Sequence, residues 1–223
     1  MRKLSLLTIV GLFVTVNAFS QNTDVPVDNF RFGLHFSPNI GWEKPDNTGV
    51  TKDGGLIGFG FGLMAEFSLS QRYSFLTGLN VTRISSGKKY SFGPLLPDFT
   101  TDLTQQYVEI PLALKLKTNE IGYLTYFGKF GITPGYRIKS KLESNAAAFA
   151  DPNYIDETQP IRLGLLIGIG TEFNISGATN LMVGVDFNNG FTNIYSKKAG
   201  NDVLGNRLRS VNNYISLNLG VFF

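Results

Sequence analysis

Side chains that could carry out chemistry are few in this chain, and their types limit what that chemistry could be. The sequence contains no cysteine and a single histidine, His35. Disulfides, thiolate metal sites, cysteine catalysis, lipidation of an N-terminal cysteine and histidine-rich metal clusters are therefore excluded. The remaining candidates are charged residues set within apolar segments: Glu66, Glu109, Lys115, Lys129, Arg162, Glu172 and Asp186. Such groups could form buried ion pairs or line a path for an ion.

None of the chemical motifs that we tested predicts a catalytic site or a cofactor. His35 lies in the middle of an alternating segment without a nucleophile-elbow motif, so a packed histidine is the simpler interpretation and a barrel hydrolase the weakest alternative. The glycines at 58–62 lie within a strand pattern and open no helix, unlike those of a nucleotide-binding loop. The acidic residues of 151–157 do not have the spacing of a calcium loop. We expect no cofactor and no metal.

The N-terminus has the organisation of a secretory signal peptide. Two basic residues follow the first Met, and an apolar run extends over 4–16. The small residues Ala18 and Ser20 lie three places and one place before Gln21. This pattern predicts a signal peptide over residues 1–20, cleaved before Gln21, and a mature chain of residues 21–223.

The composition of the chain favours a folded protein rich in apolar surface. Charged residues make up 17% of the sequence and aromatic residues 13%, whereas an average soluble domain has about 25% charged residues. Without the two basic residues of the signal peptide, 18 basic residues remain against 17 acidic ones. This balance argues against disorder and against a basic surface for nucleic acid, and we expect no nucleic-acid partner.

After Gln21, the apolar residues are distributed with a period of two rather than in one long run, so no transmembrane helix is predicted. In the first segment, for example, Phe32, Leu34 and Phe36 share one face. Eight segments have this pattern: 30–37, 57–69, 73–83, 107–117, 123–136, 161–173, 181–188 and 214–223. Their length of about ten residues suits a tilted strand that crosses a membrane. The predicted fold is an all-β, eight-stranded, antiparallel up-and-down transmembrane β-barrel.

The connections between these segments are alternately long and short. The long ones are 43–55, 84–105, 137–159 and 190–213, and the short ones are 70–72, 119–122 and 174–179. Short turns on one side and long loops on the other are typical of outer-membrane barrels, with the short turns in the periplasm. A soluble secreted barrel would also alternate, but its apolar face would point inward.

The two faces of each strand predict what lies inside the barrel and what lies outside. In lipid the apolar face must point outward, and an eight-stranded barrel is just wide enough for side chains to fill it. Strand height places Lys129 and Asp186 near mid-barrel, and Glu109 and Arg162 near the outer mouth. Lys115, Glu66 and Glu172 fall near the periplasmic end, and we expect ion pairs across the lumen. Glycines on the inward face leave a narrow pore or a small-ligand conduit open as an alternative.

Aromatic residues at the strand ends mark the membrane interfaces. Trp42, Tyr73 and Tyr136 have outward parity and are predicted to lie in the interfacial girdles. Arg83 is either a snorkelling residue near lipid phosphates or the first residue of a loop. The chain ends within a strand at Phe223, on the apolar face, and we expect the barrel-assembly machinery to contact this C-terminal strand.

The nonapeptide Tyr107-Val-Glu-Ile-Pro-Leu-Ala-Leu-Lys115 resembles a strand of the PorT-type outer-membrane β-barrel family of Bacteroidota. The segment 131–137 and the Phe-Ser-Gln at the end of the signal peptide are similar to that group as well. The resemblance implies a small outer-membrane barrel, and one member of the family is linked to type IX secretion. It carries over no catalytic residue. Pro111 within the nonapeptide predicts a local bulge.

Together these patterns predict a monomeric, non-enzymatic barrel in the outer-membrane lipid, with a structural, binding or envelope-assembly and secretion-related role. The long loops, with Phe92, Phe99, Tyr154 and Tyr195, are the expected contact surface for a protein partner.

Overall fold

The computed structural model describes residues 30–45, 50–90, 99–145, 150–177, 179–199 and 208–223. The elements, in chain order, are β1 (Phe30–Pro45), β2 (Val50–Ser68), β3 (Tyr73–Tyr90), β4 (Phe99–Glu109), β5 (Leu112–Lys117), β6 (Leu124–Ser144), β7 (Ile161–Ser176), β8 (Thr179–Gly190), the 3-10 helix η3 (Lys197–Ala199) and β9 (Ser210–Phe222). No helix among these residues is long and apolar enough to cross a membrane.

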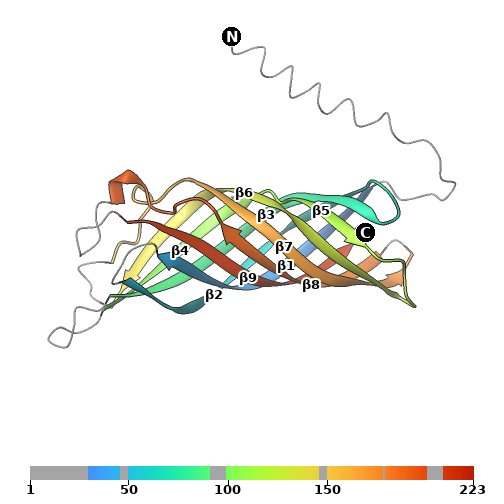
Figure 1. Cartoon of the computed structure of the whole chain (residues 1–223), viewed down its shortest axis with the longest axis horizontal. Coiled ribbons are helices and arrows are strands. Elements are labelled where there is room, and N and C mark those ends of the chain that lie inside the picture. The colour runs from blue at the N-terminus through green and yellow to red at the C-terminus, as the bar shows by residue number, and fades with distance from the viewer. Residues whose placement is uncertain (1–29, 46–49, 91–98, 146–149, 178, 200–207) are drawn as a thin grey trace, which may run out of the picture.

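The strands form one closed antiparallel sheet (Figure 1). Apart from β4 and β5, each strand pairs with the next in the chain, and β1 pairs with β9 to close the ring. Strands β4 and β5 are two halves of one barrel strand, because both pair with β3 on one side and with β6 on the other. The ring therefore has eight strands, and the predicted fold class is confirmed. Closure gives the backbone groups of the ladders partners within the protein, as a lipid environment requires.

The break between β4 and β5 lies at Pro111, which has no N–H to donate to the ladder. The pairing of β3 keeps the same offset on both sides of the break, so no extra residue is inserted and the predicted bulge at Pro111 is wrong. The register shift lies one strand away, on β6. Gln106 pairs with Lys139 and Tyr107 with Arg137, which leaves Ile138 as the additional residue.

The strands extend well beyond the predicted segments on one side of the barrel. The predicted connection 84–105 contains the last residues of β3 and the first of β4, and Lys88 there pairs with Thr101. Likewise β6 continues through the start of the predicted loop 137–159 to Ser144. The four long connections are therefore shorter than predicted. In these extensions both faces carry polar residues, so the hydropathy alternation ends although the hydrogen-bonded ladder continues.

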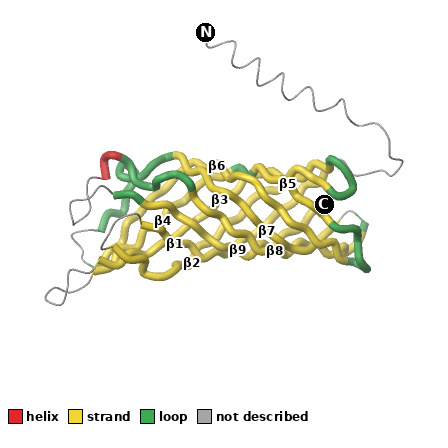
Figure 2. Tube along the Cα trace, viewed as in Figure 1, coloured by secondary structure: helices red, strands yellow, loops and turns green. Residues whose placement is uncertain are grey.

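The opposite end of the barrel has tight turns, and Figure 2 shows them as short green links between strands. Gly122 and Gly177 lie in two of these turns with φ angles of 68° and 55°, a left-handed conformation that glycine adopts without strain. The third turn is closed by the N–H of Leu69, which donates to the carbonyl of Tyr73 at 2.9 Å. Short turns at one end and longer segments at the other match the predicted arrangement.

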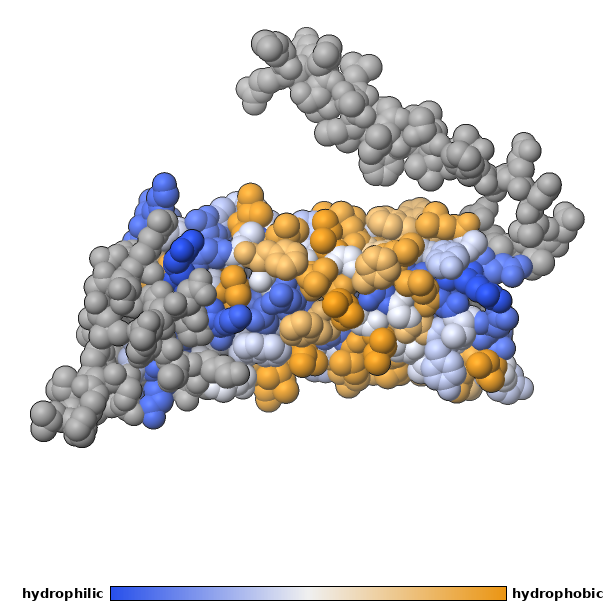
Figure 3. Space-filling model, viewed as in Figure 1, coloured by the Kyte–Doolittle hydropathy of each residue, from blue (hydrophilic) through white to orange (hydrophobic). Residues whose placement is uncertain are grey.

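The face of the barrel in Figure 3 has an apolar band with polar residues toward both ends, and every strand of the ring carries exposed large apolar side chains. Outward-facing side chains such as Ile169 and Phe61 are 69% and 49% exposed, although they are large and apolar. A soluble barrel would bury these side chains, so the band identifies the surface that faces lipid. The predicted assignment of inside and outside is confirmed.

The predicted interfacial residues all lie on this outer surface or at its edge. Tyr73, Tyr136 and the C-terminal Phe223 are exposed. Trp42 is half-buried, since its ring stacks on that of Phe187 with 6.2 Å between the ring centroids.

Candidate functional site: the barrel interior

The seven charged residues singled out in the sequence all point into the barrel and are buried. They form three separate groups at different heights. Strand β7 shows the order: Glu172 lies toward the end with the tight turns, Gly168 near the middle, and Arg162 toward the other end, the outer mouth. Every one of the seven has an ion-pair partner of opposite sign.

The group nearest the tight turns, here called the inner cluster, consists of Arg31, Glu66, Lys115, Lys117 and Glu172. Lys115 Nζ donates to Glu66 at 2.8 Å and also to Glu172. Arg31 binds the same two carboxylates, at 2.8 Å and 2.9 Å. Lys117 Nζ lies 2.8 Å from the second oxygen of Glu66. Because these residues come from β1, β2, β5 and β7, the cluster spans the lumen from wall to wall.

Within the inner cluster, Lys115 is the most enclosed cation. Its side chain is fully buried, whereas those of Arg31 and Lys117 are 11% and 13% exposed at the edge of a polar vestibule. The ammonium also lies 4.4 Å from the ring centroid of Phe127 and 4.9 Å from that of Phe222. Aromatic faces and two carboxylates thus replace the water that this charge would have outside the protein.

An apolar layer follows the inner cluster toward the middle of the barrel. Its members are Met64, Leu76, Ala113, Phe127, Leu166, Met182 and Phe222. All are nearly inaccessible to solvent, and Phe222 is completely so. Strand parity places Met64, Ala113, Met182 and Phe222 inside the barrel, but parity alone does not predict that apolar side chains from several strands form one layer. Side chains of this size fill the width of an eight-stranded barrel.

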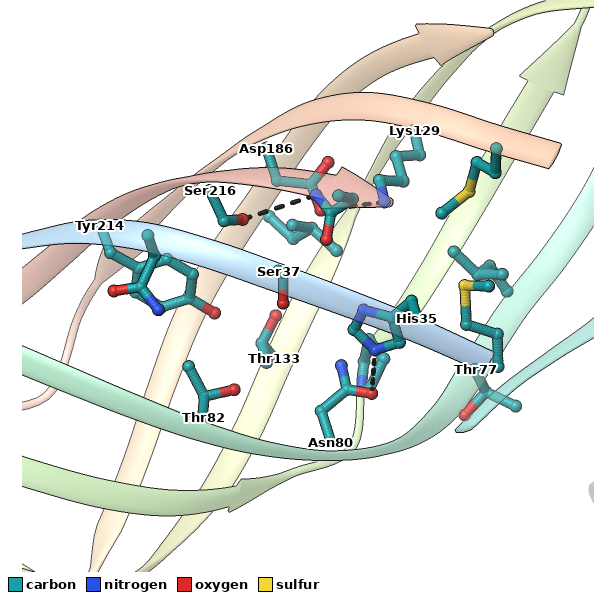
Figure 4. A pocket seen from close by; sticks show the side chains of 17 residues that line it. His35, Ser37, Thr77, Asn80, Thr82, Lys129, Thr133, Asp186, Tyr214 and Ser216 are labelled. Carbon is teal, nitrogen blue, oxygen red and sulfur yellow. Dashed lines mark hydrogen bonds and ion pairs between the residues drawn. The ribbon is translucent and has the colours of Figure 1, made fainter. Parts of the chain in front are cut away.

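Above the apolar layer lies a small chamber with a cavity volume of about 50 Å³. Figure 4 shows its polar side chains, which point inward from several strands. Lys129 Nζ lies 2.9 Å from Asp186 in its wall, and His35 forms a hydrogen bond of 2.8 Å with Asn80. Asp186 Oδ1 and His35 Nδ1 are buried without a protein partner. A chamber of this size suits water molecules, whereas small-molecule ligands usually occupy several hundred Å³.

The next group toward the outer mouth, the outer cluster, is centred on Arg162, whose side chain is 1% exposed. Its Nη1 donates to Glu109 at 3.0 Å. Its other nitrogens donate to Asn212 Oδ1 at 2.7 Å and to Asn188 Oδ1 at 2.6 Å. The guanidinium therefore connects β7 with its neighbour β8 and with β4 and β9, two strands that lie on opposite sides of the ring.

Both carboxylate oxygens of Glu109 also have hydrogen-bond donors. Its second oxygen accepts hydrogen bonds from Thr82 at 2.8 Å and from the hydroxyl of Tyr214 at 3.1 Å. The ring of Tyr107 packs beside the guanidinium, with its centroid 5.9 Å from the central carbon of Arg162. The outer cluster is thus a second plug across the lumen, separated from the inner cluster by the chamber and the apolar layer.

A fourth group, the mouth cluster, was not predicted. Lys88 Nζ lies 2.6 Å from Glu43, and it donates to the hydroxyl of Tyr195 at 2.7 Å. Tyr195 donates in turn to Glu43 at 3.3 Å, and Ser86 donates to the same carboxylate at 2.8 Å. Burial raises the pKa of Tyr195 well above its usual value, so the hydroxyl stays protonated and can act as a donor.

Tyr195 belongs to the connection between β8 and β9, and its contacts hold that segment against the barrel mouth. With Leu103 and Ile194 it forms a small apolar core, against which Leu142 and Tyr154 pack. The prediction that Tyr195 presents a contact surface is therefore wrong, because the ring is 4% exposed and anchors the segment. Tyr154 is half-buried for the same reason. Phe92 and the side chain of Phe99 lie outside the described residues.

Sequence reasoning overlooked three charged members of these clusters: Arg31, Glu43 and Lys88. Arg31 has inward parity in the first alternating segment, which was the available signal. Glu43 and Lys88 lie in strand extensions, within the predicted connections 43–55 and 84–105. Within the described ranges, no three side chains with metal-binding groups lie close enough together to hold an ion.

Comparisons with a family model and with solved structures relate this chain to known proteins. Residues 19–196 match the family model described as the outer membrane protein beta-barrel domain. Among solved structures, the chain is similar to Neisserial surface protein A, with 13% identity over 87% of this chain and 96% of that chain and a TM-score of 0.49. It is also similar to OprG of Pseudomonas aeruginosa (12% identity, 87% and 95% coverage, TM-score 0.47). The attachment invasion locus protein of Yersinia pestis has 13% identity, 87% and 97% coverage and a TM-score of 0.40. A search of curated proteins found no match.

Proposed function

Because the chain belongs to the family of outer membrane protein beta-barrel domains, we propose that it acts in the outer membrane as a closed, non-enzymatic barrel with a structural, binding or envelope-assembly role. In this proposal, residues 1–20 are removed as a signal peptide, although they lie outside the described residues. The mature barrel is a monomer in the lipid, and the assembly machinery contacts its C-terminal strand. The resemblance to PorT-type proteins of Bacteroidota supports an envelope-assembly or secretion-related role.

The observation that carries the proposal is the double obstruction of the lumen. The inner and outer clusters each cross the barrel with buried ion pairs, and the apolar layer lies between the inner cluster and the chamber. An ion moving through would have to separate charges that are held in a low-dielectric interior, which costs several kcal/mol for each pair. A closed barrel therefore fits the described residues better than a narrow pore or a small-ligand conduit.

A closed lumen leaves the two ends of the barrel as the places where partners bind. The end with the tight turns would face the periplasm, as is usual for such barrels. The end with the mouth cluster would then face the cell exterior. Segments 150–160 and 191–199, which fold against that mouth, would be the described parts of the contact surface.

Selective labelling of introduced cysteines tests this orientation. The chain has no native cysteine, so each variant carries a single thiol. Asn153 lies exposed in the connection after β6, and Gln71 lies exposed in the turn between β2 and β3. We expect a membrane-impermeant maleimide to label Asn153→Cys on intact cells, because the thiol would face the medium. Gln71→Cys should react only after the cells are lysed. Labelling of Gln71→Cys alone on intact cells would reverse the orientation.

A further inference from the structure

The outward-facing surface becomes basic at the outer edge of the apolar band on β3, β4 and β6. Val81, Val108 and Tyr136 pair with one another across these three strands and form one outward-facing rung. The two valines are half-buried and Tyr136 is exposed, so this rung still belongs to the band. A tyrosine at such a position marks the level of the lipid headgroups.

The next rung toward the cell exterior is basic. Arg83 pairs with Gln106, and Gln106 pairs with Lys139. One rung further out, Thr104 pairs with Lys141. Arg83, Lys139 and Lys141 are all exposed, and here they are called the basic edge. Arg83 also pairs with Phe59 on β2, and Ile138 directly precedes Lys139; both apolar side chains are exposed, so the basic edge lies directly against the apolar band.

Two acidic residues lie near the basic edge, and both are farther from the apolar band. Asp102 and Glu143 pair with each other one rung beyond Lys141. Lys141 Nζ lies 2.5 Å from Glu143, but the two side chains are 53% and 60% exposed. An ion pair in water contributes at most about 1 kcal/mol, so this lysine can exchange its partner readily. The charges closest to the membrane are therefore positive.

On the opposite side of the barrel, the exposed basic residues lie farther from the apolar band: Lys44 pairs with Val211 one rung beyond Trp42, and Arg209 precedes β9. There Asn189 pairs with Asn213, and Asn213 pairs with Trp42. Trp42 lies half-buried on Phe187 and Asn213 is buried, so this side presents aromatic and amide groups. The basic edge differs from this side because Arg83 and Lys139 are joined through Gln106 in a single rung next to the apolar band.

We propose that the basic edge is a binding site for the phosphate group of an outer-leaflet lipid. Neighbouring strands are about 4.8 Å apart, so Arg83 and Lys139 lie about 10 Å apart at their Cα atoms. Their long side chains can converge on one phosphate over the shorter Gln106, whose amide is a further donor. The Arg83 guanidinium suits bidentate contact with two phosphate oxygens, and the lysines add charge. The site requires neither the loops nor the closed lumen, and a reversed orientation would change only the leaflet.

Lipid binding by the folded mature barrel tests this site. We would compare the wild type, Arg83→Gln/Lys139→Gln/Lys141→Gln and a control with the same loss of charge, Lys44→Gln/Lys197→Gln/Lys198→Gln, whose lysines are exposed elsewhere. Each protein in nonionic detergent receives phosphatidic acid or phosphatidylcholine, and native mass spectrometry measures the bound lipid. Removal of one charge near an anionic lipid weakens binding about fivefold, so the triple change should weaken phosphatidic acid binding on the order of a hundredfold.

The proposal predicts that the wild type and the control bind phosphatidic acid equally and prefer it to phosphatidylcholine. Arg83→Lys should retain part of the binding, because it keeps the charge and loses the bidentate contact. Heat-dependent gel migration verifies that each variant is folded. Equal binding by the basic-edge variant, or an equal loss in the control, would overturn the proposal. Binding of inorganic phosphate as tightly as the lipid would overturn the assignment to a lipid.

Discussion

Arg162→Met is expected to destabilise the barrel by about 3–5 kcal/mol, the range for breaking a buried ion pair by removing one partner. Glu109 would keep only its hydrogen bonds from Thr82 and Tyr214, in a site where its side chain is 1% exposed. Asn188 and Asn212 would lose their guanidinium donor as well. Urea unfolding of the barrel refolded into phosphatidylcholine vesicles measures the effect.

Two further variants separate the loss of pairing from the loss of packing. Lys117→Met removes a cation that is 13% exposed, and Glu66 keeps both Arg31 and Lys115, so we expect a loss below about 1 kcal/mol. Adding Glu109→Gln to Arg162→Met removes the unpaired charge and should recover part of the stability. An Arg162→Met barrel as stable as the wild type would contradict the assigned role of the outer cluster.

Gly131→Val is expected to prevent β6 from reaching its normal distance from β5. A Cβ atom at Gly131 would lie 2.1 Å from the carbonyl oxygen of Leu112 and 2.5 Å from the Cα of Ala113. Both contacts are with backbone atoms, which cannot rotate away as the end of a side chain can. We expect a loss of at least about 1–3 kcal/mol, the usual cost of overpacking, and a smaller folded fraction.

Gly128→Val is the matched control, three residues away on the same strand. Its Cβ would meet a single atom, the carbonyl oxygen of Gly168, at 4.0 Å. Valine also favours strands, so this variant should fold as well as the wild type. The folded fraction of each is measured as the band that migrates faster without heating. Equal folding of the two variants would show that close approach at Gly131 is not required.

The strand number and the inside-outside assignment could be predicted from sequence because of a single physical feature. Where a strand crosses lipid, one face must be apolar and the other must fill a narrow lumen, so hydropathy alternates with the backbone. For this reason the apolar Ile169 faces the lipid, whereas its neighbour Gly168 faces the lumen. The outer ends of the strands lack that contrast. Lys88 and Thr101 pair in a ladder whose two faces are polar, and nothing in the hydropathy of that region separates it from a loop.

The same contrast explains how far the interior could be predicted. Parity placed Lys115 and Glu172 inside, and their heights along the strands placed them at the same level. Parity does not specify which carboxylate a long side chain reaches, since Lys115 spans two neighbours across the lumen. Phe127 is a further limit, because its inward parity, shared with Lys129, places the ring in the lumen but does not specify what the ring contacts. The ring lies against the ammonium of Lys115, a contact that depends on the side-chain conformations of both residues.

Planar-bilayer recording of the purified, refolded barrel tests the central claim of a closed lumen most directly. With two ion-paired plugs and an apolar layer across the lumen, insertion of the wild type should produce no discrete conductance steps. Recording with Arg162→Met should also be silent if that variant folds, because the inner cluster still crosses the barrel. Reproducible single-channel steps from the folded wild-type barrel would contradict the account and identify a conducting path through both clusters.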